Sequence, residues 1–214
     1  MPRGLTDLPF TSYLEPAETV CAEGEYDCAQ FDGITFTDPD ARNARFTECV
    51  FRSVRFDQGM MQSARFGAVW MHGVRLTGTD LSDTVWLDAE VIEGAFSGVE
   101  AAGAELRRVV FHGCKLDSVN LRGAELASVS FVDCVVRHLD IGDANVSKVS
   151  FPGSEIAGLS LRHARLTKVD FRGARSITVA DGVEALKGAI VTSGQVMELA
   201  PAFAASIGLT VEDE

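Results

Sequence analysis

The side chains that could bind a metal or carry out redox chemistry are four histidines and five cysteines. The cysteines are odd in number and form no CxxC pair, so neither a zinc site nor a disulfide framework is expected. Cys114 and Cys134 are interpreted as small buried residues, which is the commonest role of a free cysteine. We therefore predict no metal, no cofactor and no enzymatic activity.

Charge offers a different kind of chemistry, the recognition of a charged partner. The chain carries 31 acids against 19 bases, a net charge of −12, which argues against direct binding of nucleic acid because lysine and arginine carry that interaction. Seven acids with no intervening base form an acidic belt: Asp80, Asp83, Asp88, Glu90, Glu93, Glu100 and Glu105. A basic patch follows later in the chain: Arg162, Arg165, Lys168, Arg172 and Arg175. Both clusters are candidate contact surfaces, and both are also typical of a solvated protein surface.

The elements that must position these charges follow from a five-residue repeat. Every fifth residue from Tyr26 to Ser176 gives 31 positions, of which 28 are large and apolar. Two residues before each lies a second series, Ala29 to Ala174, in which 26 of 30 residues are small. A period of five fits neither a helix at 3.6 residues per turn nor a strand at 2. It predicts a chain that turns a corner every five residues.

Four such corners close a coil of 20 residues, and successive coils stack at the ordinary spacing of β-strands, about 4.8 Å. Residues 20 apart support this arrangement, since phenylalanine recurs at Phe31, Phe51, Phe111 and Phe131. Glycine recurs at the corner that follows this column but is absent from the corner after the Phe46 column. We therefore predict type II turns, which need a positive φ, at the first corner and another turn type at the second.

The repeat, as in Thr79-Asp80-Leu81-Ser82-Asp83, resembles that of the pentapeptide-repeat proteins. The resemblance covers residues 26–176. It implies an all-β fold, a right-handed quadrilateral β-helix of about eight coils, with a short C-terminal α-helical segment. Within the family, the sequence most resembles the quinolone- and albicidin-resistance branch, whose members mimic DNA and bind DNA gyrase.

Three segments are expected: an N-terminal cap (1–23), the β-helix (24–191) and a C-terminal helical segment (192–214). Leu8, Phe10, Tyr13 and Leu14 are the predicted contacts of the N-terminal cap. In the C-terminal segment an apolar stripe lies at helical spacing. The stripe consists of Val196, Leu199, Phe203 and Ile207. It covers the last coil, joins two copies into a dimer as in the resistance proteins of the family, or does both.

The resemblance implies a non-enzymatic DNA mimic, homodimeric through its C-terminal segment, that binds type II topoisomerase (gyrase) and modulates it or protects it from antibiotics. The alternative is an interaction scaffold with an unrelated partner, using the acidic belt, the basic patch or the outward column of Trp70 with Val50 and Val110. The sequence shows no secretory signal and no apolar run of about 20 residues, so a cytoplasmic protein without a membrane span is expected.

Overall fold

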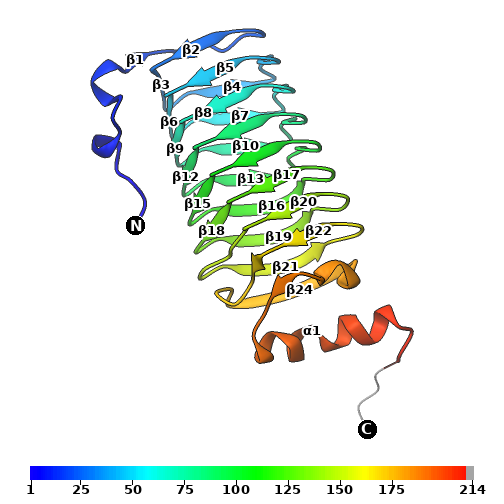
Figure 1. Cartoon of the computed structure of the whole chain (residues 1–214). Helices are drawn as coiled ribbons and strands as arrows, with labels where there is room; N and C mark the ends of the chain where they lie inside the picture. The colour runs from blue at the N-terminus through cyan, green and yellow to red at the C-terminus, as the bar shows by residue number, and fades with distance from the viewer. Residues whose placement is uncertain (211–214) are drawn as a thin grey trace.

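The computed structural model, which describes residues 1–210, is a solenoid whose parallel strands stack in regular layers (Figure 1). From β2 (Glu25–Asp27) to β17 (Glu125–Ala127) each strand pairs with the strand 20 residues later, so that Phe56, Leu76 and Phe96 lie directly above one another. The predicted quadrilateral β-helix of about eight coils is confirmed.

Three faces of the solenoid are β-sheets. Sheet 1 consists of β1 (Glu15–Pro16), β3 (Ala29–Asp32), β6 (Val50–Arg52), β9 (Trp70–His72), β12 (Glu90–Ile92), β15 (Val110–His112) and β18 (Ser130–Val132). Sheet 2 consists of β4 (Thr35–Thr37), β7 (Arg55–Asp57), β10 (Arg75–Thr77), β13 (Ala95–Ser97), β16 (Lys115–Asn120), β19 (Val135–Asp140), β21 (Glu155–Ser160) and β24 (Ser176–Asp181). Sheet 3 consists of β2 (Glu25–Asp27), β5 (Arg45–Thr47), β8 (Arg65–Gly67), β11 (Val85–Leu87), β14 (Glu105–Arg107), β17 (Glu125–Ala127), β20 (Asn145–Ser147) and β22 (Arg165–Thr167).

The fourth face lies between sheet 2 and sheet 3 and is held by single bridges, such as those that join Asp80 to Met60 and to Glu100. From β16 onward the strands of sheet 2 continue around the corner onto this face. Near the C-terminal end, β23 (Val169–Asp170) pairs with β25 (Ala189–Ile190).

The interior is filled by stacks of like residues. Phe31 and Phe51 lie parallel with ring centroids 4.9 Å apart, and Phe111, Phe131 and Phe151 repeat this at 4.9 and 5.2 Å. These large residues and the small residues two positions earlier form one continuous core. The prediction that like residues stack over like is therefore confirmed.

The corners share a positive φ. Every fifth residue from Glu23 to Lys168 has a positive φ, and only nine of these thirty residues are glycine. The corner after the Phe46 column is left-handed too, with φ of +52° at Ala68 and +58° at Ser128. The predicted difference in turn type between the two corners is therefore not seen in φ, which is positive at both.

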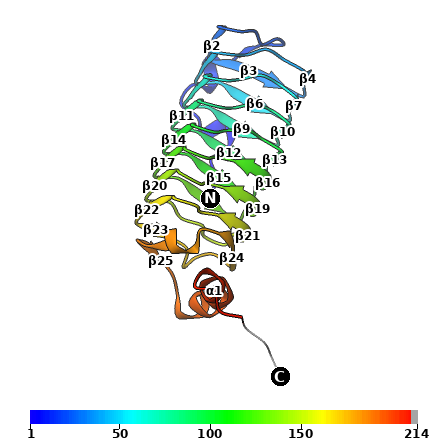
Figure 2. The ribbon, with the colours of Figure 1, turned by 90° about the vertical axis from the view of Figure 1, so that its right-hand side faces the viewer.

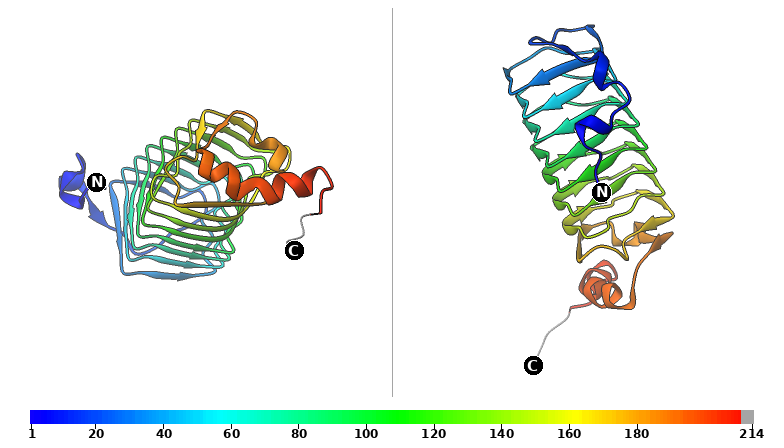
Figure 3. Two further views of the ribbon diagram at one scale, coloured as in Figure 1. Left: turned by 90° about the horizontal axis from the view of Figure 1, so that it is seen from below. Right: turned by 90° about the vertical axis from the view of Figure 1, so that its left-hand side faces the viewer.

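The N-terminal segment runs along the side of the solenoid (Figure 3, right). It contains two short 3₁₀ helices, η1 (Leu5–Asp7) and η2 (Thr11–Tyr13). Leu8 and Phe10 are buried against the outward side chains of sheet 1, with Leu14 packed beside them, whereas Tyr13 is exposed. These residues were expected to cover the end of the solenoid, and the structure corrects their placement: residues 17–20 contact the core there instead, through Ala17 and Val20.

At the other end the register changes by one residue, since Glu155 pairs with Ser176 rather than with Arg175. Ile177 is consequently buried where the five-residue series predicts Ser176. After η3 (Val183–Leu186), α1 (Ser193–Ser206) lies beneath the last coil (Figure 2). Within residues 1–210, no helix is long and apolar enough to cross a lipid bilayer.

The left-handed corners predict that substitutions at two exposed positions change the free energy of unfolding in opposite directions. Ser128→Gly is expected to raise the free energy of unfolding by about 0.5 kcal/mol, because relief of a left-handed non-glycine residue outweighs the added flexibility of glycine. Gly98→Ala, at φ +60° with nothing within 4 Å of the added Cβ, should lower it by about 1 kcal/mol. Urea denaturation measures both, and a stabilising Gly98→Ala would contradict the account.

Candidate protein-interaction surface on the fourth face

The fourth face carries a column of side chains along the solenoid that are polar at every position but Met60. Paired residues on successive coils place these residues above one another: Asp40, Met60, Asp80, Glu100, Asn120, Asp140, Ser160 and Asp181. We call this set the carboxylate column. A repeat of 20 residues therefore brings together acids that are far apart in the sequence.

Local backbone geometry explains why aspartate and asparagine occupy this column. The Oδ1 atoms of Asp40, Asp80 and Asp140 each accept a hydrogen bond from the backbone N–H two residues later, at 3.2, 2.9 and 2.8 Å. Asn120 accepts the same bond from Arg122 at 3.0 Å. Such turns satisfy a backbone N–H that no strand partner reaches on this face. The remaining carboxylate oxygen is free to make other contacts.

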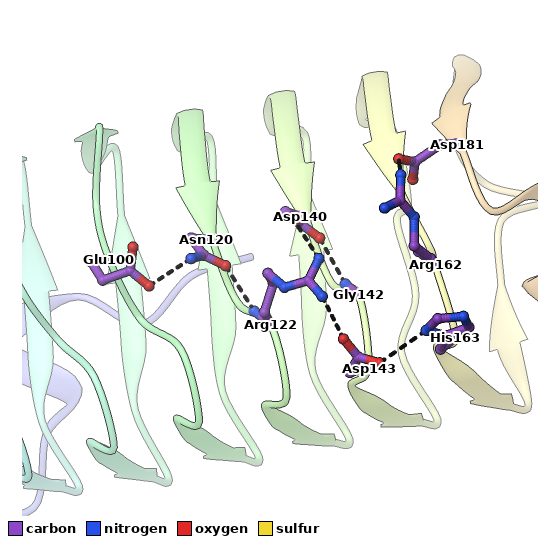
Figure 4. Close-up of polar contacts among 9 residues, drawn as sticks. All are labelled: Glu100, Asn120, Arg122, Asp140, Gly142, Asp143, Arg162, His163 and Asp181. Carbon is purple, nitrogen blue, oxygen red and sulfur yellow. Dashed lines mark hydrogen bonds and ion pairs between the residues drawn. The ribbon is translucent and has the colours of Figure 1, made fainter.

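In the C-terminal half of the face these oxygens join a polar network (Figure 4). Glu100 accepts a bond from the Asn120 amide at 2.6 Å, and Arg122 contacts Asp140 at 3.5 Å and also Asp143. Asp143 lies 3.2 Å from the imidazole of His163. The carboxylates of this half are therefore held in fixed positions by neighbouring coils.

Three acids of the same face have no basic partner among residues 1–210. Asp80 contacts only Gln62 and Ser82, Glu100 contacts only Asn120, and Asp83 stands at the adjoining corner. By contrast Asp40 is bound by the Arg42 guanidinium and backbone N–H, which lower the pKa of its carboxyl to about 2. Asp80, Asp83 and Glu100 are thus the acids of this face whose charge no lysine or arginine neutralises among residues 1–210.

The predicted acidic belt surrounds the solenoid instead of forming one surface. Asp80, Asp83 and Glu100 lie on or beside the fourth face, and the other four acids lie on other faces or corners. Three of those four pair with arginine: Asp88 with Arg108, Glu90 with Arg3, and Glu105 with Arg107. Glu93 lies 3.6 Å from His72, a contact that is an ion pair only when the imidazole is protonated. Sequence reasoning missed Asp140 and Asp143, although the signal was visible: Asp140 follows Glu100 by two coils of 20 residues, and Asp143 follows Asp83 by three.

The basic patch likewise spreads around the last coils. Arg162 pairs with Asp181, Arg172 with Asp170, and Arg175 with Asp133 and Glu155. Arg165 and Lys168 have no acidic partner among residues 1–210. Only these two members of the patch present an uncompensated positive charge.

The C-terminal apolar stripe divides into a covering part and an exposed part. Leu199 is fully buried against the core of the last coil, whereas Val196, Phe203 and Ile207 are exposed by 45 %, 39 % and 74 %. Gln195 fixes the helix to that coil by donating to the backbone oxygens of Phe171 and Ala174 at 2.6 and 3.3 Å. Thr192 and Gln195 also form a capping box at the start of α1. Helix α1 therefore covers the coil and leaves an apolar surface outward.

Within residues 1–210, one group has the side chains of a metal site. Ligand atoms of Asp27, Cys28 and Glu48 lie within 4.8 Å of one another. Burial, together with the charges of Asp27 and Glu48, raises the pKa of the Cys28 thiol. A protonated thiol is a poor metal ligand, because metals bind the thiolate. The group is explained by a contact between the Cys28 thiol and the Glu48 carboxylate at 3.7 Å.

Comparisons with known proteins identify the repeat. Two family models match the chain, "Pentapeptide repeats (8 copies)" over residues 29–67 and "Pentapeptide repeat region" over residues 86–161. Together they cover just over half of the sequence, and the chain belongs to the pentapeptide-repeat family. No curated protein sequence matched the chain.

Solved structures with a similar arrangement share little sequence with it. A trypsin-treated variant of QnrB1, a plasmid-mediated fluoroquinolone resistance protein, is 16 % identical over 94 % of this chain and 99 % of its own, with a TM-score of 0.44. HetL is a pentapeptide repeat protein involved in heterocyst differentiation regulation from the cyanobacterium Nostoc sp. strain PCC 7120. It is 19 % identical over 79 % of this chain and 91 % of its own, with a TM-score of 0.25.

The ion pairs between coils predict that the stability of the fold depends on pH. Arg108 donates to both oxygens of Asp88, at 2.6 and 2.9 Å, and these bonds lower the pKa of the Asp88 carboxyl. A lowered pKa means that this pair stabilises the fold above about pH 4 and ceases to do so as the pH falls through the lowered value. In Arg108→Met the pKa of Asp88 should rise towards about 3.9, the value of an unperturbed aspartate.

Carbon-detected NMR titration of the side-chain carboxyls measures this pKa. Arg165→Met serves as the control, because Arg165 has no acidic partner among the described residues. The stability difference between the wild type and Arg108→Met should shrink below pH 4. An unchanged pKa of Asp88 in Arg108→Met would contradict the assignment.

Proposed function

We propose that this protein is a non-enzymatic DNA mimic that binds a type II topoisomerase (DNA gyrase) through the fourth face and protects it from antibiotics. The observation that carries the proposal is the alignment of uncompensated carboxylates along one face. The resemblance of the repeat to the resistance branch of the family supports the choice of partner.

The density of charge on the fourth face is comparable with that of duplex DNA. From the coil of Asp80 to the coil of Asp140 the distance is about 14 Å, three steps of about 4.8 Å. This stretch carries five carboxylates, on Asp80, Asp83, Glu100, Asp140 and Asp143, and one guanidinium, on Arg122, which gives five minus one, or −4. A duplex of that length carries about eight phosphate charges, of which about half face any one side. A basic groove that binds DNA therefore meets a similar charge here.

A homodimer joined through α1 completes the proposal. Phe203 and Ile207 project outward beyond the part of the helix that covers the solenoid, and Leu209 beside them is 60 % exposed. Exposed apolar side chains gathered at one end of an elongated molecule are typical of a protein–protein contact. Pairing of two copies there would place their fourth faces on one longer rod.

The alternative, an interaction scaffold with an unrelated acidic partner, is favoured by Arg165 and Lys168. These two residues keep their charge uncompensated on the last coils. A pull-down that recovers a stoichiometric acidic protein, and no topoisomerase, would favour this alternative.

The proposal predicts that wild-type protein inhibits gyrase supercoiling at micromolar concentration, and that it restores the reaction when a quinolone is present. The combined variant Asp80→Asn, Asp83→Asn and Glu100→Gln should weaken both effects roughly tenfold, because it removes the complementary charge. Asparagine at position 80 keeps the oxygen that accepts the N–H of Ser82, so the fold is preserved.

The matched control removes the same number of charges elsewhere, in Asp32→Asn, Asp88→Asn and Glu105→Gln, whose carboxylates pair with Arg52, Arg108 and Arg107. Because these carboxylates are already paired within the molecule, the control should retain most of the activity. Absence of any effect of the wild type, in supercoiling or protection, would refute the proposed function. Equal losses in both variants would refute the assignment to the fourth face.

The dimer is tested by sedimentation velocity. Phe203→Asp combined with Ile207→Asp should convert a dimeric wild type into a monomer, since both side chains are exposed and contribute to no core. Leu199→Ala should instead lower the stability by roughly 2–5 kcal/mol while the protein stays dimeric. A monomeric wild type would exclude the proposed contact.

A further inference from the structure

One strand edge of the solenoid is open at its N-terminal end. Strand β4 is the first strand of sheet 2 and pairs with β7 alone (Figure 2). The carbonyl of Ile34 and the N–H of Asp38 both bond to β7, at 2.8 Å. Because alternate residues of a strand direct their backbone groups to opposite sides, the N–H and C=O groups of Thr35 and Thr37 face away from β7. Within residues 1–210 these four groups have no hydrogen-bond partner.

The chain bypasses this edge as it enters the first coil. The Ala17 N–H donates to the Gln30 carbonyl at 2.9 Å, and the Glu23 N–H donates to the Arg42 carbonyl at 2.7 Å. Between these two contacts the entering chain advances six residues, from 17 to 23, whereas the coil beneath it advances twelve, from 30 to 42. A segment of half the length cannot follow the same perimeter. It crosses the end of the coil instead and adds no strand to β4.

The side chains below the open edge are apolar and incompletely covered. Ile34 and Phe36 are only partly buried, whereas their equivalents one coil later, Val54 and Phe56, are 0 % and 4 % exposed. The Phe36 ring stacks on Phe56 with centroids 5.1 Å apart, and Phe56 is in turn covered by β4. A further strand with apolar side chains over Ile34 and Phe36 would bury them as β4 buries the coil below.

Other edges and apolar columns of the solenoid are already occupied. Strand β1 pairs with β3 and closes the edge of sheet 1, and the Tyr26 hydroxyl of β2 accepts a bond from the Cys21 N–H at 2.9 Å. At the opposite end α1 packs on β24 and η3 packs on β22. The outward column of Trp70 and Val50, a candidate partner contact from the sequence, is buried beneath the N-terminal segment. Strand β4 thus keeps both free backbone groups and uncovered apolar side chains.

The charge around the open edge favours a basic occupant. Residues 4–41 contain nine acids and no lysine or arginine. Arginine side chains pair with three of these acids: Glu25, Asp32 and Asp40. On β7, Arg55 and Asp57 offset one another, but Asp38, directly after β4, has no lysine or arginine partner among the described residues. A second copy of this chain would bring the same acids against these, so like charges disfavour end-to-end contact of two copies.

We propose that the open edge of β4 is a docking site for an extended, basic segment of a partner protein, which adds to sheet 2 as a further strand. Its backbone bonds to the N–H and C=O groups of Thr35 and Thr37, the mode of recognition called β-augmentation. Two apolar side chains, two residues apart, cover Ile34 and Phe36, and basic side chains lie beside Asp38. The site lies at the end of the solenoid, apart from the fourth face, and goes beyond the proposed function.

Binding of a labelled peptide to the full chain tests the proposal. The probe is fluorescein-labelled Lys-Val-Lys-Phe-Lys-Val-Lys, in which lysine alternates with apolar residues. Fluorescence anisotropy should show saturable binding. A peptide of the same composition with the three apolar residues adjacent, and an analogue with glutamate in place of lysine, should each bind at least tenfold more weakly.

Backbone pairing is tested with two further peptides, each methylated on alternate backbone nitrogens. One of the two should lose at least tenfold in affinity and the other should not, because only alternate N–H groups of an added strand face β4. This comparison uses the unaltered protein. Equal affinities of the two methylated peptides would overturn the proposal.

Variants of β4 locate the site. Thr37→Pro should weaken binding at least tenfold, because it removes an N–H that faces the added strand and that no residue of the chain uses. Thr37→Val keeps this N–H and should bind as the wild type does. Circular dichroism and the melting temperature show whether both variants are folded. Absence of saturable binding at about 1 mM peptide, or equal affinity of the two folded variants, would overturn the proposal.

A second copy of the chain as the occupant is a separate outcome. Sedimentation velocity of the Phe203→Asp, Ile207→Asp variant, in which the proposed contact through α1 is removed, should show a monomer. Self-association of that variant which Thr37→Pro abolishes would assign the edge to a second copy and overturn the assignment to a basic partner segment.

Discussion

A left-handed residue at every fifth position is the constraint on which the rest of the structure depends. Thirty of these residues follow one another without interruption, and each turns the chain through one corner of the coil. Four corners return the backbone to its starting direction after 20 residues, so that identical environments stack along the molecule. The unfavourable conformation at the non-glycine corners is offset by the core stacks and by backbone hydrogen bonds between coils, such as Ser128 N–H to Ser147 O at 3.0 Å.

This constraint explains which features the sequence predicts well. The inward residues, such as Phe111 and Ala124, face the same environment on every coil, and their period therefore reveals both the fold and the stacks. The prediction failed where the period is lost: Ile177 replaces Ser176 because one extra residue enters the last coil. Glycine was also a misleading guide to the corners, since packing and hydrogen bonding hold Ala68 in the conformation that glycine prefers.

The candidate surfaces were harder to predict because they depend on outward side chains. A run of acids along the sequence becomes a ring around the solenoid, and neighbours 20 residues away decide which charges remain. Arg108 neutralises Asp88 in this way, whereas Asp80 finds only neutral partners. The N-terminal segment shows the same limitation, since Leu8 and Phe10 are evident as apolar residues in the sequence but the face that they cover is not. Pairing with arginine therefore leaves four acids of the belt without an arginine or lysine partner among residues 1–210, and three of these lie on or beside the fourth face.

The faces of the solenoid differ in chemistry: the fourth face is acidic, and the apolar residues Val50, Trp70 and Ile92 of sheet 1 are covered by the N-terminal segment. The central claim is that the fourth face occupies the site where a topoisomerase binds DNA. The most direct measurement is competition on the enzyme, in which the anisotropy of a labelled DNA duplex bound to gyrase is followed as this protein is added. The account predicts complete displacement of the duplex, at concentrations that rise in proportion to the amount of DNA. Simultaneous binding of duplex and protein at saturation would contradict it.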